Sequence, residues 1–257
     1  MVYCISLFGE RQQSTINYLN IMTSSADDRK KGIVELLIGL YPKAKIALRY
    51  RSPWELLVAV ILSAQCTDVM VNKITPKLFA KFPSVRAFAD ADISQLEQAV
   101  RPTGFFRNKA RNIKNTARKL INDYQGQVPD KMDELIRLPG VARKTANIVL
   151  ANAFGINAGI AVDTHVSRIS QRLRLVDVSS LGGGKKQYFQ KHSRIDLDFI
   201  KDANSDKIER QLIALVPEPR RYIFTYALID HGRSVCKAVA PRCQQCALAG
   251  QCPASRA

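Results

Sequence analysis

LPGVARKTAN, residues 138–147, places a Pro-Gly turn between two segments that both have helical patterns. The segment before the turn, residues 130–138, is predicted to begin with Asp130 as its N-cap. The helix after the turn has Arg143 and Lys144 in its first turn. Because a helix N-terminus carries about half a positive charge, a lysine is disfavoured there. The position of Lys144 therefore calls for an explanation beyond helix formation.

The turn itself predicts an anion site. Gly140 permits a left-handed backbone, and the amides of Gly140, Val141 and Ala142 are expected to point outward at the helix start. The chain has 39 Lys and Arg against 22 Asp and Glu, a net charge of +17. Such a surplus favours a polyanion as partner, so we expect the bound anion to be a nucleic-acid phosphate.

Lys144 and Asp163 are predicted to rim one cavity. No charged residue lies between them, and Asp163 occupies an N-cap position before the helix at 163–175. Taken singly, a solvated lysine and a plain N-cap explain the two residues equally well. Taken together, they predict a buried lysine whose charged form is disfavoured by desolvation and by the helix end. A neutral amine in that position would be a nucleophile toward a carbonyl-like carbon.

Length and composition predict a two-domain globular protein. The chain has 257 residues, of which 46% are hydrophobic and 24% charged. Its most apolar run, residues 145–162, is interrupted by Asn and Gly, and residues 1–22 lack the pattern of a signal peptide. We therefore expect a cytoplasmic protein without a membrane partner, whose cysteines do not form structural disulfides.

Four of the six cysteines form a C-x6-C-x2-C-x5-C pattern near the C-terminus, outside Cys4 and Cys66. Closely spaced thiols in a cytoplasmic chain are typical of a metal site. The spacing alone leaves tetrahedral zinc and a [4Fe–4S] cluster equally open. The predicted ligands are Cys236, Cys243, Cys246 and Cys252.

Helical patterns dominate the remaining sequence, without clear strand alternation. Residues 52–65 begin with a capping box of Ser52 and Glu55 and continue as a core helix. Residues 105–124 form an amphipathic helix, and segment 179–204 is predicted to be a long loop or insertion. Basic residues predicted on the solvated face of the amphipathic helix are Arg107, Lys109, Arg111, Lys114, Arg118 and Lys119.

These motifs, in this order, resemble endonuclease III, a family of helix-hairpin-helix DNA glycosylases. The resemblance rests on LPGVARKTANIVL, AVDTH and the cysteine pattern, and it extends to SPWELLVAVILSAQCTD, TGFFRNKARNI and IDHGRSVC. It implies an all-α fold of two helical domains with a DNA-binding cleft between them. The implied divisions are a helical barrel-like domain at 46–157, a cluster domain at 30–45 plus 158–257, and a poorly structured extension at 1–29. It also implies that the four cysteines hold a [4Fe–4S] cluster.

The resemblance assigns roles to single residues. Lys144 matches the Schiff-base lysine and Asp163 the aspartate that assists it. Gln65 matches the residue that fills the gap left by a flipped nucleotide, and Phe105 stands where the family inserts an apolar wedge. Lys237 and Arg242 lie in a loop that contacts phosphate in the family. The hairpin departs from the family pattern, since its second glycine is Ala142 here.

The resemblance implies a bifunctional DNA glycosylase and AP lyase that removes oxidised pyrimidines in base excision repair. Its partner would be double-stranded DNA with damaged bases or abasic sites, and it would act as a monomer. One alternative is an adenine-specific mismatch glycosylase, which shares the cysteine spacing but lacks a lysine at the position of Lys144. The other is a non-catalytic DNA-binding protein with a structural zinc site.

Overall fold

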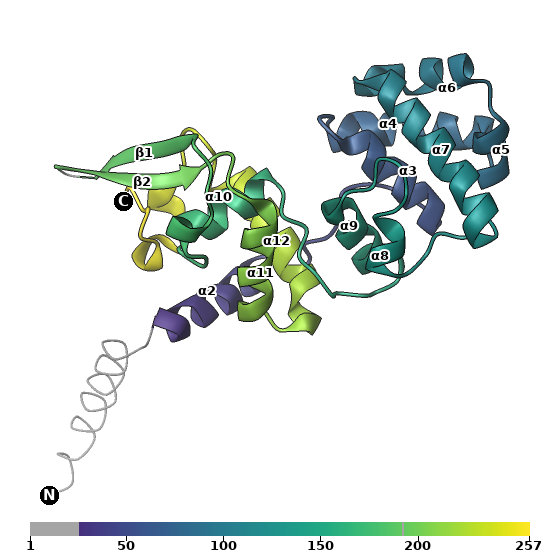
Figure 1. The fold of residues 1–257 in the computed structure, drawn as a ribbon. Coiled ribbons are helices and arrows are strands. Elements are labelled where there is room, and N and C mark those ends of the chain that lie inside the picture. The colour runs from purple at the N-terminus through teal and green to yellow at the C-terminus, as the bar shows by residue number, and fades with distance from the viewer. Residues whose placement is uncertain (1–25, 192) are drawn as a thin grey trace, which may run out of the picture.

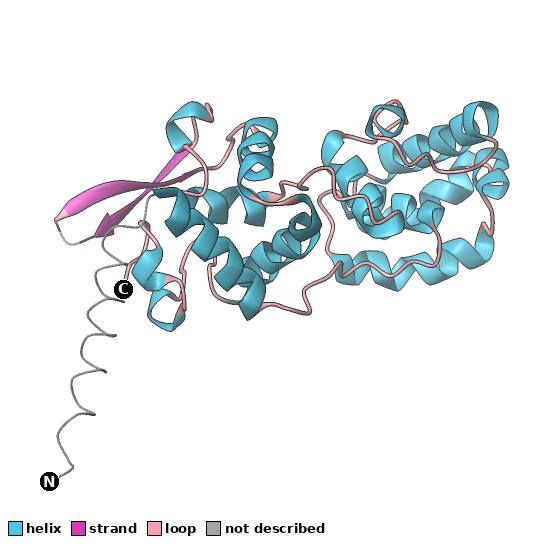
Figure 2. Cartoon of the chain, turned by 90° about the horizontal axis from the view of Figure 1, so that it is seen from below, coloured by secondary structure: helices cyan, strands magenta, loops and turns pink. Residues whose placement is uncertain are grey.

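The computed structural model describes residues 26–257 apart from residue 192, and the chain forms two helical lobes (Figure 1). Loops at 41–52 and 154–163 connect the lobes (Figure 2). The first lobe contains α3 (Pro53–Ser63), α4 (Asp68–Lys81), α5 (Val85–Asp90), α6 (Ile93–Val100), η1 (Arg101–Thr103), α7 (Phe106–Tyr124), α8 (Met132–Leu135) and α9 (Arg143–Ala153). The second contains α2 (Ala26–Leu40), α10 (Thr164–Arg172), η2 (Val178–Ser180), β1 (Lys186–Lys191), β2 (Arg194–Ile200), α11 (Ser205–Leu215), η3 (Glu218–Arg220), α12 (Arg221–Ser234), η4 (Cys243–Gln245) and η5 (Ala249–Gln251). The predicted all-α fold class is confirmed.

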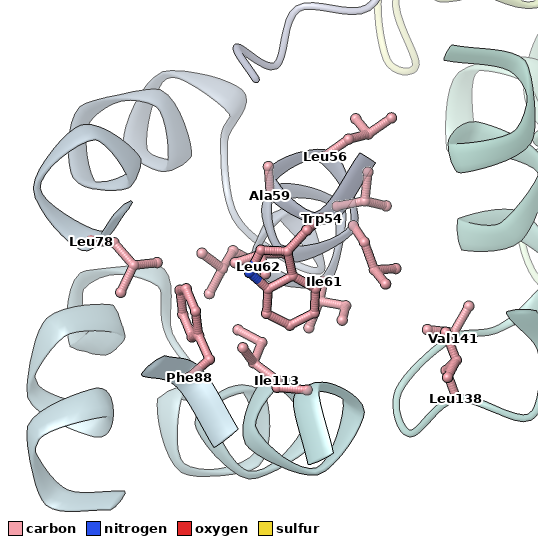
Figure 3. Packing of buried hydrophobic residues seen from close by; sticks show 14 of the residues in the cluster. Trp54, Leu56, Ala59, Ile61, Leu62, Leu78, Phe88, Ile113, Leu138 and Val141 are labelled. Atoms are coloured by element: carbon pink, nitrogen blue, oxygen red, sulfur yellow. The ribbon is translucent and has the colours of Figure 1, made fainter. Parts of the chain in front are cut away.

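The core of the first lobe is built around α3. Every residue of this helix from Leu56 to Leu62 is buried, as its uniformly apolar sequence predicts. Figure 3 shows Phe88 and Ile113 from neighbouring helices packed beside Trp54 of α3. The rings of Trp54 and Phe88 meet edge to face, with centroids 5.3 Å apart.

A second buried cluster holds the other lobe together. Ile33 and Leu37 of α2 pack with Ile169 of α10 and Phe224 of α12. The buried apolar residues of α2 and most of those from Ile160 onward belong to this cluster, whereas those from Leu48 to Leu150 belong to the first. A small third cluster joins Ala44 to Tyr226 and Ala227 of α12. On this basis we propose the domain bounds 46–157 and 30–45 plus 158–257.

The helix starts agree with the capping rules at α3 and depart from them at α8. Ser52 accepts a hydrogen bond from the amide of Glu55 (3.1 Å), as predicted. The prediction of Asp130 as a helix N-cap is wrong, because α8 begins at Met132 with Lys131 as N-cap. The helix lasts only four residues, since turn hydrogen bonds lead the chain from Leu135 toward the Pro-Gly turn.

The sequence prediction for Lys109 of α7 is also wrong. Lys109 is 5% exposed, although it was expected on the solvated face of this helix. It precedes the buried residues Ile113, Thr116 and Leu120 by 4, 7 and 11 positions, so it belongs to the apolar stripe of the helix. Whether Lys109 is buried is thus decided by its position in the helical repeat and not by the charge of its side chain.

Segment 179–204 is not an irregular loop. β1 and β2 pair antiparallel, with Phe189 opposite Asp196 and a register shift between Gln187 and Tyr188. Phe199 at the end of β2 is buried against the second lobe. Burial of this end of the hairpin stabilises strand pairing that was not predicted.

The predicted N-terminal extension, residues 1–29, lies mostly outside the described residues, and its last four residues form the start of α2. Within the part of the chain that the structure describes, no helix is both long and apolar enough to cross a membrane.

Candidate active site

A cavity of about 400 Å³ is lined by side chains from both lobes. The first lobe contributes Gln65 and Lys144, and the second contributes Asp163 and His165 from the start of α10. The prediction that Lys144 and Asp163 rim one cavity is therefore confirmed. A volume of this size is typical of small-ligand sites and would admit a single nucleotide.

The carboxylate of Asp163 is held in place by the start of α10. Its Oδ1 atom accepts hydrogen bonds from the amides of His165 and Val166, both at 2.8 Å. Oδ2 accepts no hydrogen bond from the described residues, so one oxygen orients the carboxylate while the other stays available to a ligand. Burial lowers the pKa of His165, Asp163 opposes this shift, and the positive charge of Lys144 adds to it.

Lys144 is exposed, so the prediction that it is buried is wrong. The buried face of α9 consists of Ala146, Asn147, Val149 and Leu150, and Lys144 lies outside this set at the open side of the cavity. The apolar run that follows Lys144 fills the core of the lobe, which does not require the lysine itself to be buried. A substrate seated over the cavity would be needed to remove its solvent.

The Pro-Gly turn presents a helix N-terminus without a side-chain cap. Ala142 is the N-cap of α9 and provides no side-chain hydrogen bond to the first-turn amides. Gly140 has a φ of +76°, as predicted for a left-handed turn residue. The amide of Val141, however, already donates to the carbonyl of Leu138 at 3.1 Å. The amide of Val141 therefore does not point outward as predicted, and the first turn of α9 lacks a side-chain cap for its free amides.

Gln65 and Phe105 share an uncommon backbone conformation. Their φ values are +53° and +45°, in the left-handed region that L-residues seldom occupy. Both side chains are exposed, Phe105 by 65%. The adjacent Phe106 packs instead against the core of the first lobe. An exposed aromatic ring on a strained residue is available to contact a ligand outside the protein.

The four predicted metal ligands line one cavity in the second lobe, together with Arg172 and His231. Burial raises the pKa of the Cys252 thiol to about 11 and also raises that of Cys246. Within the described ranges, no three His, Cys, Asp or Glu side chains are grouped closely enough to hold a single metal ion. The fold thus brings Cys236, Cys243, Cys246 and Cys252, which the sequence predicts as ligands of one metal centre, to a single cavity.

Lys237 and Arg242 are exposed in the loop between the first two of these cysteines. Arg172, which is 2% exposed, lies inside the lobe and contacts the buried side of this loop. Its guanidinium donates to the carbonyls of Lys237 (2.7 Å) and Ala238 (2.9 Å) and to Sγ of Cys236 (3.4 Å). Asp198 of β2 accepts two hydrogen bonds from the same guanidinium, each 2.7 Å long. The β1–β2 hairpin thus holds Arg172 in place through Asp198, and Arg172 in turn holds the loop between Cys236 and Cys243.

Two ion pairs that join the lobes were not predicted. Arg233 of α12 pairs with Asp68 of α4 at 2.7 Å, and both residues line the 400 Å³ cavity. Arg143 of α9 pairs with Glu209 of α11, also at 2.7 Å. Each pair joins residues far apart in the sequence, and no local pattern could have identified them.

Comparison with known proteins identifies related chains. Residues 58–191 match the HhH-GPD superfamily of base excision DNA repair proteins. The chain is 46% identical to endonuclease III of Synechocystis sp. over 91% of this chain and 96% of that protein. It is 36% identical to endonuclease III of Escherichia coli K12 over 82% of this chain and 88% of that protein.

Two solved structures share the fold. They are a non-covalent endonuclease III–DNA complex and a trapped endonuclease III–DNA covalent intermediate. Each has a TM-score of 0.78 and 37% identity, and covers 91% of this chain and 98% of the other. By sequence and by fold, the chain belongs to the endonuclease III family of the HhH-GPD superfamily.

Proposed function

We propose that this protein is a bifunctional DNA glycosylase and AP lyase that removes oxidised pyrimidines in base excision repair. The observation that carries the proposal is the shared cavity of Lys144 and Asp163. It brings a primary amine and an oriented carboxylate together beside Gln65, in a chain of net charge +17. We further propose that it acts as a monomer in the cytoplasm, since one chain supplies every group named here.

In the proposed reaction the damaged nucleotide leaves the duplex and enters the cavity, because its C1′ atom is not accessible inside the base stack. The amine of Lys144 attacks C1′, and the base departs with the electron pair of its glycosidic bond. Asp163 stabilises the positive charge that develops on the sugar and assists the transfer of protons. The sugar ring opens to an imine with Lys144, loss of the C2′ proton follows, and β-elimination expels the 3′ phosphate.

The DNA would be bound from both lobes. The uncapped first turn of α9 is suited to a phosphate, because free amides and the helix dipole both favour an anion. Lys237 and Arg242 would contact a second phosphate. Gln65 would fill the space of the flipped nucleotide, and Phe105 would stack on the orphaned partner base.

We propose that Cys236, Cys243, Cys246 and Cys252 hold a [4Fe–4S] cluster. The cysteines line a common cavity, and the cationic Arg172 lies against Cys236, which suits a cluster of net negative charge. When bound, the cluster would order the loop that carries Lys237 and Arg242, and the proposed reaction needs no redox step. About four irons per chain are expected, whereas a single zinc would contradict this assignment.

Trapping with borohydride tests the lyase proposal, because it reduces a Schiff base to a stable amine. Lys144→Gln should abolish the trapped adduct on abasic and oxidised-pyrimidine duplexes while DNA affinity stays near that of the unmodified protein. Lys119→Gln is a matched control, since Lys119 lies on α7, outside the cavity lining, and pairs with Asp123. A normal yield of adduct from Lys144→Gln would refute the role of Lys144. Cleavage of adenine mismatches in preference to oxidised pyrimidines would refute the proposed substrate.

A further inference from the structure

Lys109 is buried under the two loops that carry Gln65 and Phe105, and it contacts the backbone that leads into each of them. Its Nζ donates to the carbonyl of Leu62 at 2.8 Å and to that of Thr103 at 2.7 Å. Leu62 is in the last turn of α3, three residues before Gln65. Thr103 ends η1, two residues before Phe105. One ammonium group therefore joins the backbones that lead into Gln65 and Phe105, both of which are exposed and have positive φ.

The carbonyls that Lys109 binds lie where a cation is favoured. The last carbonyls of a helix have no partner within it, and this end of the helix carries partial negative charge. Lys109 thus caps α3 and η1 together. A side chain without a hydrogen-bond donor, such as methionine, would leave both buried carbonyls unsatisfied.

The charge of Lys109 has no ordinary ion-pairing role. No carboxylate in the described part of the chain forms an ion pair with it. Burial lowers the pKa of Lys109, and the nearby Cys66 opposes part of this shift. A buried, unpaired ammonium is a poor device for stability alone, because its desolvation opposes folding. Its two backbone contacts point to a role in fixing loop geometry.

We propose that Lys109 is a positioning residue that holds the loops of Gln65 and Phe105 at a fixed separation for joint insertion into duplex DNA. The inference rests on the proposed function. Strained backbone persists only where surrounding contacts enforce it, and the carbonyls of Leu62 and Thr103 are the points at which Lys109 enforces it. Without the ammonium, each loop could relax independently, and the two side chains would no longer reach both sides of one gap.

The test compares two substrates for Lys109→Met. The first is a duplex with an oxidised pyrimidine, which needs both insertions, and the second is a single-stranded abasic oligonucleotide, which has no partner base. We expect kcat/KM to fall about 10- to 100-fold on the duplex and less than about 3-fold on the single strand. Lys114→Met is the matched control, because Lys114 is on the same helix and donates to the carbonyl of Ala91, away from both loops. It should leave the ratio of the two activities unchanged.

A double-mutant cycle shows whether Lys109 acts through the loops. In a Gln65→Ala/Phe105→Ala background, Lys109→Met should reduce duplex activity by less than about 3-fold, because the groups it positions are already absent. An undiminished loss in that background, or equal losses on both substrates, would overturn the inference. If Lys109→Met does not fold, Lys109→Gln replaces it, since it lacks the charge but keeps an amide donor. An unmodified protein inactive on both substrates would instead refute the proposed function.

Discussion

Gly140→Ala tests whether the Pro-Gly turn before α9 contributes to DNA binding as well as to folding. Gly140 has a φ of +76°, and a Cβ atom added there would lie 2.6 Å from Nδ2 and 2.9 Å from Cβ of Asn112. Gly126 provides a matched control, because its φ is +79° and an added Cβ would have no neighbour within 4 Å. The two substitutions share the backbone strain, and only Gly140→Ala adds a steric conflict.

The expected magnitudes follow from this difference. A left-handed alanine costs roughly 1–2 kcal/mol, so both variants should lose about that much stability. At Gly140 the turn must also move by about 0.5 Å to bring the 2.9 Å contact with Cβ of Asn112 to an ordinary 3.4 Å. Such a shift would misplace the amides at the start of α9. Loss of one hydrogen bond to a charged phosphate costs about 1.5–3 kcal/mol, which weakens DNA binding roughly 10- to 150-fold.

Fluorescence anisotropy with a duplex that carries a non-cleavable abasic analogue measures this loss, and thermal melting measures stability. Gly140→Ala should raise Kd within the stated range, while Gly126→Ala should leave Kd unchanged at a similar loss of stability. Equal changes in Kd for the two variants would refute the reasoning. So would a Gly140→Ala protein that binds as tightly as the unmodified chain.

Two further substitutions separate exposed from buried roles. Phe105→Ala should lower excision from duplex DNA about 5- to 150-fold, the equivalent of 1–3 kcal/mol of lost stacking, with a smaller effect on a single-stranded abasic substrate. Since Phe105 is 65% exposed, its removal should leave Tm unchanged, and a lowered Tm with equal losses on both substrates would assign it to packing. Asp198→Asn should lower stability by about 3–5 kcal/mol, because it leaves the buried guanidinium of Arg172 without its carboxylate. Thermal melting should show Tm lowered by roughly 6–20 °C, and a change under about 2 °C would contradict the structural role of this pair.

The rules for helix caps, apolar runs and turns predicted those parts of the structure that depend on interactions between neighbouring residues. Ser52 and Asp163 are helix N-caps, as their residue types and following sequences indicate. The continuous apolar run of α3, from Leu56 to Leu62, is entirely buried. Gly140 adopts the left-handed conformation that a Pro-Gly turn favours. Each of these predictions depends only on interactions between residues a few positions apart, which can be read directly from the sequence.

The errors arise where packing between distant segments overrides local character. Lys144 follows the Pro-Gly turn and precedes an apolar run, yet only the residues after it face the core. Lys109 is charged, yet its position in the helical repeat places it beneath α3 and η1. Alternation of apolar and acidic residues in β2 was a usable signal for a strand. Its partner strand β1, with the sequence KQYFQK, has no such alternation, so the pairing of the two strands was not predicted.

The N-cap of α7 departs from the rules that predict the other helix starts, and the role proposed for Phe105 supplies a physical reason. An N-cap normally has an extended backbone and a side-chain oxygen that accepts from the helix amides. Phe105 has φ +45° and ψ +30°, and makes no capping hydrogen bond. A serine or aspartate here would stabilise the helix start, but it could not stack on an unpaired base. The residue therefore sacrifices local stability, and the two carbonyl contacts of Lys109 supply part of the restraint that the cap does not.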